Sequence, residues 1–184
     1  APLLPGAIVN PAAIRYHYQI PDNLQGKSPL NSQSVAEYEN QWYDSDDLSM
    51  FFERNNLPDT PVSRVVGFNN NTEGQDGGEA DLDIQYLMGI GVNISTWFIS
   101  LDNTPGADGF LEWIILLLAL GDNAPLLQST SYGANERFIS SSYLDRVSED
   151  LMKFGMTGHT IFFSSGDYGV GCNCNLPVAP EKYV

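Results

Sequence analysis

Two acidic residues, Glu79 and Asp83, stand four positions apart in the stretch from 77 to 90. Apolar residues recur there at every fourth position, namely Leu82, Tyr86 and Ile90. This spacing predicts an amphipathic helix, and two helical residues four apart lie one turn from each other on the same face. Like charges at that spacing are unfavourable when both are ionised, and more so when they are buried. The pair is therefore a candidate for general acid–base chemistry.

A third acid of this stretch, Asp81, lies about 200° around the helix from Glu79. The three acids therefore do not converge on one face, which argues against a metal site built from them. The simple alternative is a helix start whose acidic residues are solvated and are favoured by the helix dipole. Spacing alone leaves this alternative and the acid–base pair open.

The composition sets limits on the fold and on the partners. With 184 residues, of which 42% are hydrophobic, the chain can form one globular domain with a core. Its formal net charge of −15 argues against nucleic acid and anionic membranes as partners, because little here neutralises phosphates. The longest apolar run, 114–120, is too short to span a bilayer. The acidity suits a protein that works at low pH, where its net charge falls.

Processing and modification signals lie at several points of the chain. The first residues lack both an initiator Met and the basic region of a secretory signal, so we expect a processed product. Asn70 and Asn93 each begin an N-glycosylation sequon. Cys172 and Cys174 form a C-x-C pair, whose Cα atoms in an extended chain lie near the outer limit for a disulfide. In an oxidising compartment we expect these cysteines to bond outside this chain.

The predicted elements alternate between strands and helices over most of the chain. Strands are predicted at 62–68, 93–100, 128–132 and 159–164, and helices at 77–90, 109–120 and 140–155. Before them the sequence predicts helices at 11–18, at 34–43 with Ser34 and Glu37 as a capping box, and from 44 to before Pro58. The alternation predicts an α/β fold with a doubly wound parallel sheet.

In such a sheet the functional residues follow the carboxyl ends of the strands. The last strand continues into Ser164-Ser165-Gly166-Asp167-Tyr168-Gly169, where Asp167 either points into a cleft or caps a turn. At the end of the preceding strand, Ser131-Tyr132-Gly133 can present backbone groups to an extended peptide. Both motifs and the start of the 77–90 helix are expected at one rim.

Together these motifs resemble those of the sedolisins, the serine-carboxyl peptidases. The resemblance rests on Gly78-Glu79-x-x-x-Asp83, Ser131-Tyr132-Gly133 and Ser164-Ser165-Gly166-Asp167-x-Gly169 in this order, and it extends from about residue 5 to the end. It implies a subtilisin-like fold and a Ser-Glu-Asp triad. Glu79 would be the general base, Asp83 would share its proton, and Asp167 would donate to the oxyanion. Residues 131–133 would line the substrate subsites.

These implied roles are chemically consistent with each other. Asp167 can donate a hydrogen bond to an oxyanion only when it is protonated, whereas Glu79 must be ionised to accept the proton of the serine. Two acids held in opposite states give a bell-shaped pH profile, here with an acid optimum. The resemblance also implies a peptide or protein substrate and a location in a lysosome, another acidic vesicle or outside the cell.

The chain departs from the family in lacking the Gly-Thr-Ser motif of the nucleophile and the calcium loop. We therefore expect residues 1–184 to be the N-terminal portion of one catalytic domain, completed by a second chain of the same precursor. That chain would carry the serine and the calcium ligands. In the family, the cysteine at the position of Cys172 forms a disulfide with a cysteine near the C-terminus. The resemblance therefore implies an interchain disulfide through Cys172 or Cys174. The alternative is a truncated, inactive relative that serves as a binding or structural protein.

One position bears on specificity. In the tripeptidyl-peptidase branch of the family an Asp follows the Ser-Tyr-Gly motif and is a candidate to hold the free amino terminus of the substrate. This chain has Ala134 there. The difference favours an endopeptidase over a tripeptidyl exopeptidase.

Overall fold

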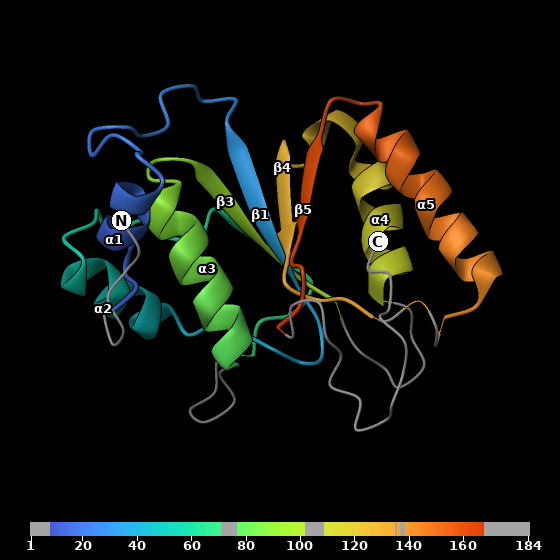
Figure 1. Ribbon diagram of the computed structural model, residues 1–184, viewed down its shortest axis with the longest axis horizontal. Helices are drawn as coiled ribbons and strands as arrows, with labels where there is room; N and C mark the ends of the chain where they lie inside the picture. Colours follow the sequence, from blue (N-terminus) through green and yellow to red (C-terminus); the bar gives the residue numbers. More distant parts are fainter. Residues whose placement is uncertain (1–7, 71–76, 102–108, 135, 137–138, 168–184) are drawn as a thin grey trace.

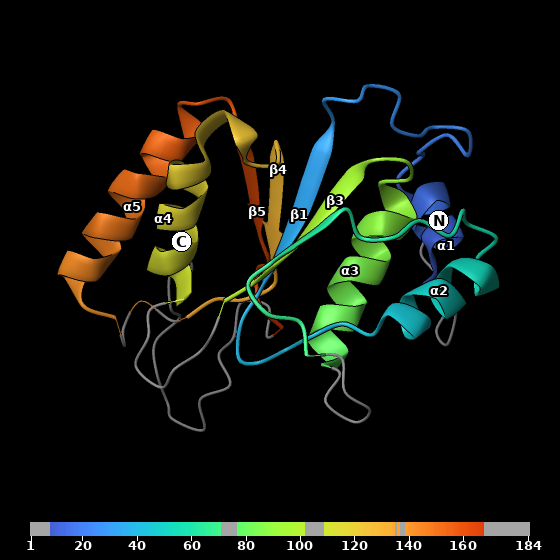
Figure 2. The ribbon, with the colours of Figure 1, turned by 180° about the vertical axis from the view of Figure 1, so that it is seen from behind.

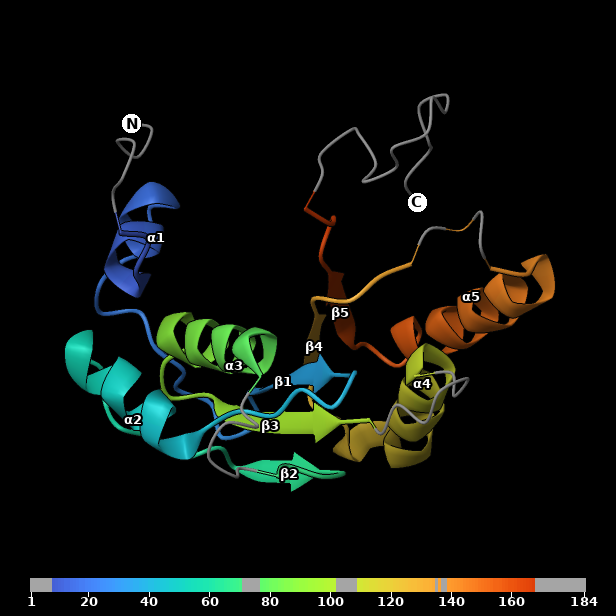
Figure 3. The same cartoon turned by 90° about the horizontal axis from the view of Figure 1, so that it is seen from below.

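The computed structural model describes residues 8–70, 77–101, 109–134, 136 and 139–167. Within them, five parallel strands form one sheet in the order β2-β3-β1-β4-β5, which Figure 3 shows as a stack. The strands are β1 (Ser32–Glu37), β2 (Arg64–Val66), β3 (Ser95–Ser100), β4 (Leu127–Thr130) and β5 (Thr160–Phe163). The helices are α1 (Pro11–His17), α2 (Ser45–Arg54), α3 (Gly78–Ile90), α4 (Gly109–Leu120) and α5 (Ser141–Gly155), with a short 3-10 turn at Gly121–Asn123.

Helices cover both faces of the sheet, with α1, α2 and α3 on one side and α4 and α5 on the other (Figures 1 and 2). Val35 and Phe98 pack into the cluster under α2 and α3, whereas Ala36 and Ile99 pack into the cluster under α4 and α5. Successive strand residues point to opposite faces, so each central strand contributes to both clusters. The predicted α/β fold with a doubly wound parallel sheet is confirmed.

Residues 34–43 do not form the predicted helix, and that prediction is wrong. Residues 34–37 of this stretch belong to β1, the central strand of the sheet. A strand buried on both faces is usually an apolar run, but β1 is largely polar. Its polar side chains are satisfied by neighbouring strands: the Ser34 hydroxyl donates to Gln128 Oε1, and Gln33 Nε2 donates to Thr96 Oγ1 at 2.9 Å. The buried polar pairs hide the usual signature of a core strand.

The other predicted elements form, with small shifts of their ends. The acidic run after 43 is a helix start, as expected. The Asp44 side chain caps α2 by accepting from the backbone N–H groups of Asp46, at 2.6 Å, and Asp47, at 3.1 Å. β4 ends at Thr130, so the Ser131-Tyr132-Gly133 motif already lies beyond the strand. None of the helices in the described ranges is long and apolar enough to cross a membrane.

Helix α3 is held at both ends. At its start, the Gly77 N–H donates to Trp42 O at 2.7 Å, and a Cβ on Gly77 would lie 2.0 Å from the Gln41 side-chain oxygen. At its end, the Arg15 guanidinium donates to Ile90 O at 2.8 Å. The helix that carries the acidic pair is therefore fixed against the segment that follows β1 and against the N-terminal segment.

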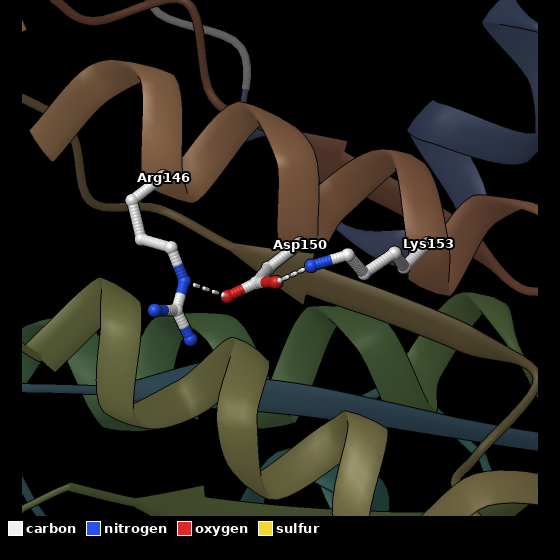
Figure 4. Close-up of polar contacts among 3 residues, drawn as sticks. All are labelled: Arg146, Asp150 and Lys153. Atoms are coloured by element: carbon white, nitrogen blue, oxygen red, sulfur yellow. Dashed lines mark hydrogen bonds and ion pairs between the residues drawn. The ribbon is translucent and has the colours of Figure 1, made fainter. Parts of the chain in front are cut away.

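Helix α5 carries an ion-pair cluster. The carboxylate of Asp150 accepts from Arg146 Nε at 2.6 Å and from Lys153 Nζ at 2.7 Å, and both basic side chains reach it along the same side of the helix (Figure 4). The side chain of Asp150 is only 3% exposed. The hydrogen bonds from Lys153 and Arg146 hold the pKa of Asp150 below its usual value.

Candidate active site

The acidic pair of α3 meets the end of β4 at the carboxyl edge of the sheet. Asp83 Oδ2 accepts a hydrogen bond from the Ser131 hydroxyl at 2.6 Å. Glu79, one turn before Asp83, is half-exposed and close enough for the charge of Asp83 to raise its pKa. Asp81 points elsewhere, because its Oδ1 accepts from the Asp44 backbone N–H at 2.9 Å. The pair is separate from the third acid, as the helical spacing predicted.

Both acids of the pair have raised pKa values. Burial raises the pKa of Asp83, and hydrogen bonds from Ser131 and Glu37 partly offset this. Burial also raises the pKa of Glu79, with the charges of Asp83 and Asp167 adding to it, while a hydrogen bond from Ser131 lowers it. Each acid therefore takes up a proton at a higher pH than a free carboxyl group, which suits proton transfer in the acid range.

A third carboxyl group, Glu37, joins the cluster and was not predicted as a site residue. It is the last residue of β1 and has no exposed surface, and its Oε2 accepts from the Tyr132 hydroxyl at 3.2 Å. Burial raises its pKa to about 9, and the neighbouring charge of Asp83 adds to the effect. Glu37 therefore holds its proton at neutral and acid pH.

Asp83 is close enough to Glu37 to take part in binding its proton. Glu37 Oε1 accepts no hydrogen bond from the described residues, and a bare carboxylate oxygen would be costly there. Glu37 and Asp83 are close enough to share a hydrogen bond, which raises the pKa of Glu37 and lowers that of Asp83. Both observations fit a protonated Glu37 that donates to an ionised Asp83.

The predicted substrate triplet follows β4 beside these acids. The hydroxyl of Tyr132 also lies 3.3 Å from Tyr38 O, and its ring packs edge-on against Tyr38 at 5.0 Å between centroids. Phe110 also packs against Tyr38, at 5.2 Å between ring centroids, so the three rings form one aromatic cluster. Gly133 is exposed. The triplet lies beside the acids, and its contact with substrate stays a prediction.

Asp167 completes the rim. It lies beyond the end of β5, is exposed, and is close enough for its charge to raise the pKa of Glu79. Glu79 and Asp83 lie on α3, and Asp167 follows the end of β5. Asp167 is 88 positions after Glu79 and 84 after Asp83, so the fold brings the three acids together. Their catalytic roles stay predictions.

The remaining predicted site residues lie away from this cluster or outside the described residues. Asn93 is exposed and precedes β3, so it lies at the amino edge of the sheet, where its Nδ2 donates to Gly26 O at 2.6 Å. Asn70 is half-buried, and the Thr72 of its sequon lies outside the described residues, as do Cys172 and Cys174. Across the described ranges, no group of three or more His, Cys, Asp or Glu side chains could hold a metal ion. The calcium ligands were predicted in a second chain, so the calcium stays a prediction.

Comparisons with known proteins connect this chain to a family. No protein-family model matches the chain. Tripeptidyl-peptidase 1 from Homo sapiens is 39% identical over 169 residues, which are 89% of this chain and 30% of that protein. Tripeptidyl-peptidase 1 from Dictyostelium discoideum is 35% identical over 167 residues, 90% of this chain and 27% of that protein. The chain thus spans about 30% of the length of the curated relatives it matches.

The fold has a solved counterpart. The structure of Pseudomonas sedolisin, a serine-carboxyl proteinase complexed with two molecules of pseudo-iodotyrostatin, matches with a TM-score of 0.51 and 21% sequence identity. The match covers 76% of this chain and 40% of that chain. It confirms the predicted subtilisin-like α/β architecture. The sequence identity to tripeptidyl-peptidase 1 and the shared architecture establish this chain as a relative within the sedolisin family.

Proposed function

We propose that this chain supplies the acidic residues of an acid-acting serine-carboxyl endopeptidase, and that a second chain of the same precursor supplies the nucleophilic serine. The observation that carries the proposal is the meeting of Glu79, Asp83 and Asp167 at the carboxyl edge of the sheet. Relatives that are 35% to 39% identical over about nine-tenths of the chain support the reaction class. Residues 1–184 would then be the N-terminal portion of one catalytic domain.

In the proposed reaction, the serine oxygen attacks the carbonyl carbon of the peptide bond while Glu79 takes up the serine proton. Asp83 hydrogen-bonds Glu79 and shares this proton. Protonated Asp167 donates a hydrogen bond to the oxyanion of the tetrahedral intermediate. Glu79 then gives its proton to the nitrogen of the leaving amine as the peptide bond breaks. Water repeats the same steps on the acyl-enzyme and releases the second product.

The proposed mechanism has an acid pH optimum. Activity falls at low pH when Glu79 is protonated and can no longer act as a base. Because burial and neighbouring acids raise the pKa of Glu79, this fall begins at a higher pH than for a free glutamate. The donor to the oxyanion must carry a proton, which also places the proposed optimum in the acid range.

The exposure of β5 at the edge of the described sheet supports the proposal of a second chain. Within the described residues β5 pairs only with β4, and its residues Phe162 and Phe163 are 56% and 47% exposed. An exposed apolar strand at a sheet edge is a site for pairing with further chain. We propose that the second chain covers this edge, carries the serine and the calcium ligands, and is linked to this chain through Cys172 or Cys174.

The substrate and the location are parts of the same proposal. Ala134 removes a carboxylate that could hold the free amino terminus of a substrate, which supports internal cleavage of peptides and proteins over removal of tripeptides. An acid optimum supports a lysosome, another acidic vesicle or the exterior of the cell. Glycans on Asn70 and Asn93 would fit each of these compartments.

The test is Glu79→Gln in the mature protein, assayed for hydrolysis of a denatured protein at acid pH. The variant removes the base but keeps the shape of the side chain, so we expect hydrolysis to fall by about a hundredfold or more with an unchanged fold. Glu112→Gln, an exposed acid on α4, is the matched control and should retain full activity. Near wild-type hydrolysis by Glu79→Gln would refute the assigned role.

The intact mass of the native protein, without and with reductant, separates the peptidase from the inactive alternative. A larger species that falls into two on reduction supports the second chain. A species of 20.2 kDa plus any glycan in both conditions, without hydrolysis, would instead identify a binding or structural relative.

A further inference from the structure

The resemblance leads us to expect Ser131 at a substrate subsite, but its side chain points towards the acids. The Ser131 hydroxyl donates to Asp83 Oδ2 at 2.6 Å, across 48 positions of sequence. A hydrogen bond of this length to a carboxylate is among the stronger ones in proteins. The single proton of the hydroxyl is therefore directed at the acidic pair, and the side chain has no second donor for a substrate.

The surroundings of Asp83 explain why such a donor is needed. Glu37 faces it from β1, Glu79 from its own helix, and Asp167 lies beyond β5 near Glu79. Among the described residues, the groups that shift the pKa values of Glu37, Glu79 and Asp83 include no basic side chain. Hydrogen bonds therefore take the place of a cation in this cluster.

The hydroxyl groups of Ser131 and Tyr132 each donate a hydrogen bond to one of these acids. The Tyr132 hydroxyl donates to Glu37 at 3.2 Å, and the Ser131 hydroxyl donates to Asp83. The hydrogen bond from Ser131 lowers the pKa of Glu79 as well as that of Asp83, so Ser131 acts on both members of the pair. The predicted pairing of residues 131–133 with an extended peptide would use backbone groups and not these hydroxyls.

We propose that Ser131 is a positioning residue, whose side-chain hydroxyl holds Asp83 in the orientation in which it shares the proton of Glu79. This inference rests on the proposed peptidase function for its kinetic consequence. It gives Ser131 a role distinct from substrate contact: the side chain orders the acidic pair, and only the backbone serves the substrate.

The kinetic test uses Ser131→Ala and Ser131→Thr in the full-length mature enzyme, with kcat and kcat/KM measured from pH 2 to 7. Loss of a donor to a carboxylate destabilises the ionised form, so the acidic limb of the profile should move up by about one pH unit in Ser131→Ala. We expect kcat to fall about tenfold with little change in KM. Ser131→Thr keeps the hydroxyl and should restore the limb. Ser148→Ala, at an exposed serine of α5, is the control and should match the wild type.

A second readout does not depend on turnover. Titration of the 13C-labelled carboxyl carbon of Asp83 by NMR should show its midpoint about one pH unit higher in Ser131→Ala than in the wild type. If the wild type hydrolyses nothing, the proposed function fails, and this titration still tests the contact. An unchanged midpoint would overturn the inference.

Two kinetic outcomes would also overturn it. A raised KM with an unmoved acidic limb would assign the Ser131 side chain to substrate contact. Complete loss of turnover in both Ser131→Ala and Ser131→Thr, with a native circular dichroism spectrum, would assign Ser131 to the covalent chemistry itself.

Discussion

Glu37 couples the stability of the fold to pH. The ordinary pKa of this carboxyl is 4.5, and burial beside Asp83 raises it to about 9 in the folded protein. Between these pH values the folded state keeps a proton that the unfolded state releases. The free energy of unfolding therefore falls by about 1.4 kcal/mol for each pH unit of increase. The stabilisation is fully present below pH 4.5 and is lost as the pH rises towards 9.

Glu37→Gln removes this titration while it keeps the size of the side chain and a hydrogen-bond donor. Between pH 5 and pH 7 the wild type should lose about 3 kcal/mol of stability relative to the variant, from two pH units at about 1.4 kcal/mol each. Urea unfolding of the intact protein at pH 5, 6 and 7, followed by tryptophan fluorescence, measures this difference.

The control is Glu39→Gln, two positions along the chain, whose side chain is exposed. Its pH dependence should follow that of the wild type. If the free energy of unfolding of Glu37→Gln changed with pH as steeply as that of the wild type, Glu37 would not be the buried, protonated group that the structure describes. Glu37 could then not donate a hydrogen bond to Asp83.

Two further predictions concern the oxyanion and α5. Asp167→Ala removes the proposed oxyanion donor, so kcat should fall by about 10²–10³ with little change in KM; steady-state kinetics at acid pH measures this, and a pure rise in KM would count against the role. Asp150→Asn removes a carboxylate whose pKa is lowered by Lys153 and Arg146, so its stabilisation exists above the unfolded-state pKa and disappears as the pH falls through the folded-state value. Thermal unfolding should show the variant less stable than the wild type at pH 7, with a difference that shrinks as the pH falls below the unfolded-state pKa, and equal stability at pH 7 would refute the argument.

The sequence was most informative where apolar residues follow a simple period. Helix α3 carries such a pattern, strand β3 is rich in β-branched and aromatic residues, and both form where predicted. β1 carries none, because the side chains of Gln33, Ser34 and Glu37 are polar and buried and hydrogen-bond with residues of other strands or of the segment after β4. Local sequence cannot reveal partners that lie 60 to 95 positions away, so the stretch resembled a capped helix.

The same limit applies to the site. The spacing of Glu79 and Asp83 is local, and it predicted their common face. Glu37 was missed because the carboxyl-edge rule can be applied only after its strand is recognised. The contact between Ser131 and Asp83 depends on how α3 lies against the end of β4, which is a property of the packed fold.

Active-site labelling of the native protein tests the central claim most directly. A fluorophosphonate forms a covalent bond only with an activated serine, and peptide mass spectrometry then locates the adduct. We predict one labelled serine outside residues 1–184, and no labelling when Glu79 is replaced by Gln. An adduct on a serine within residues 1–184, or no adduct on a natively folded and intact protein, would contradict the account.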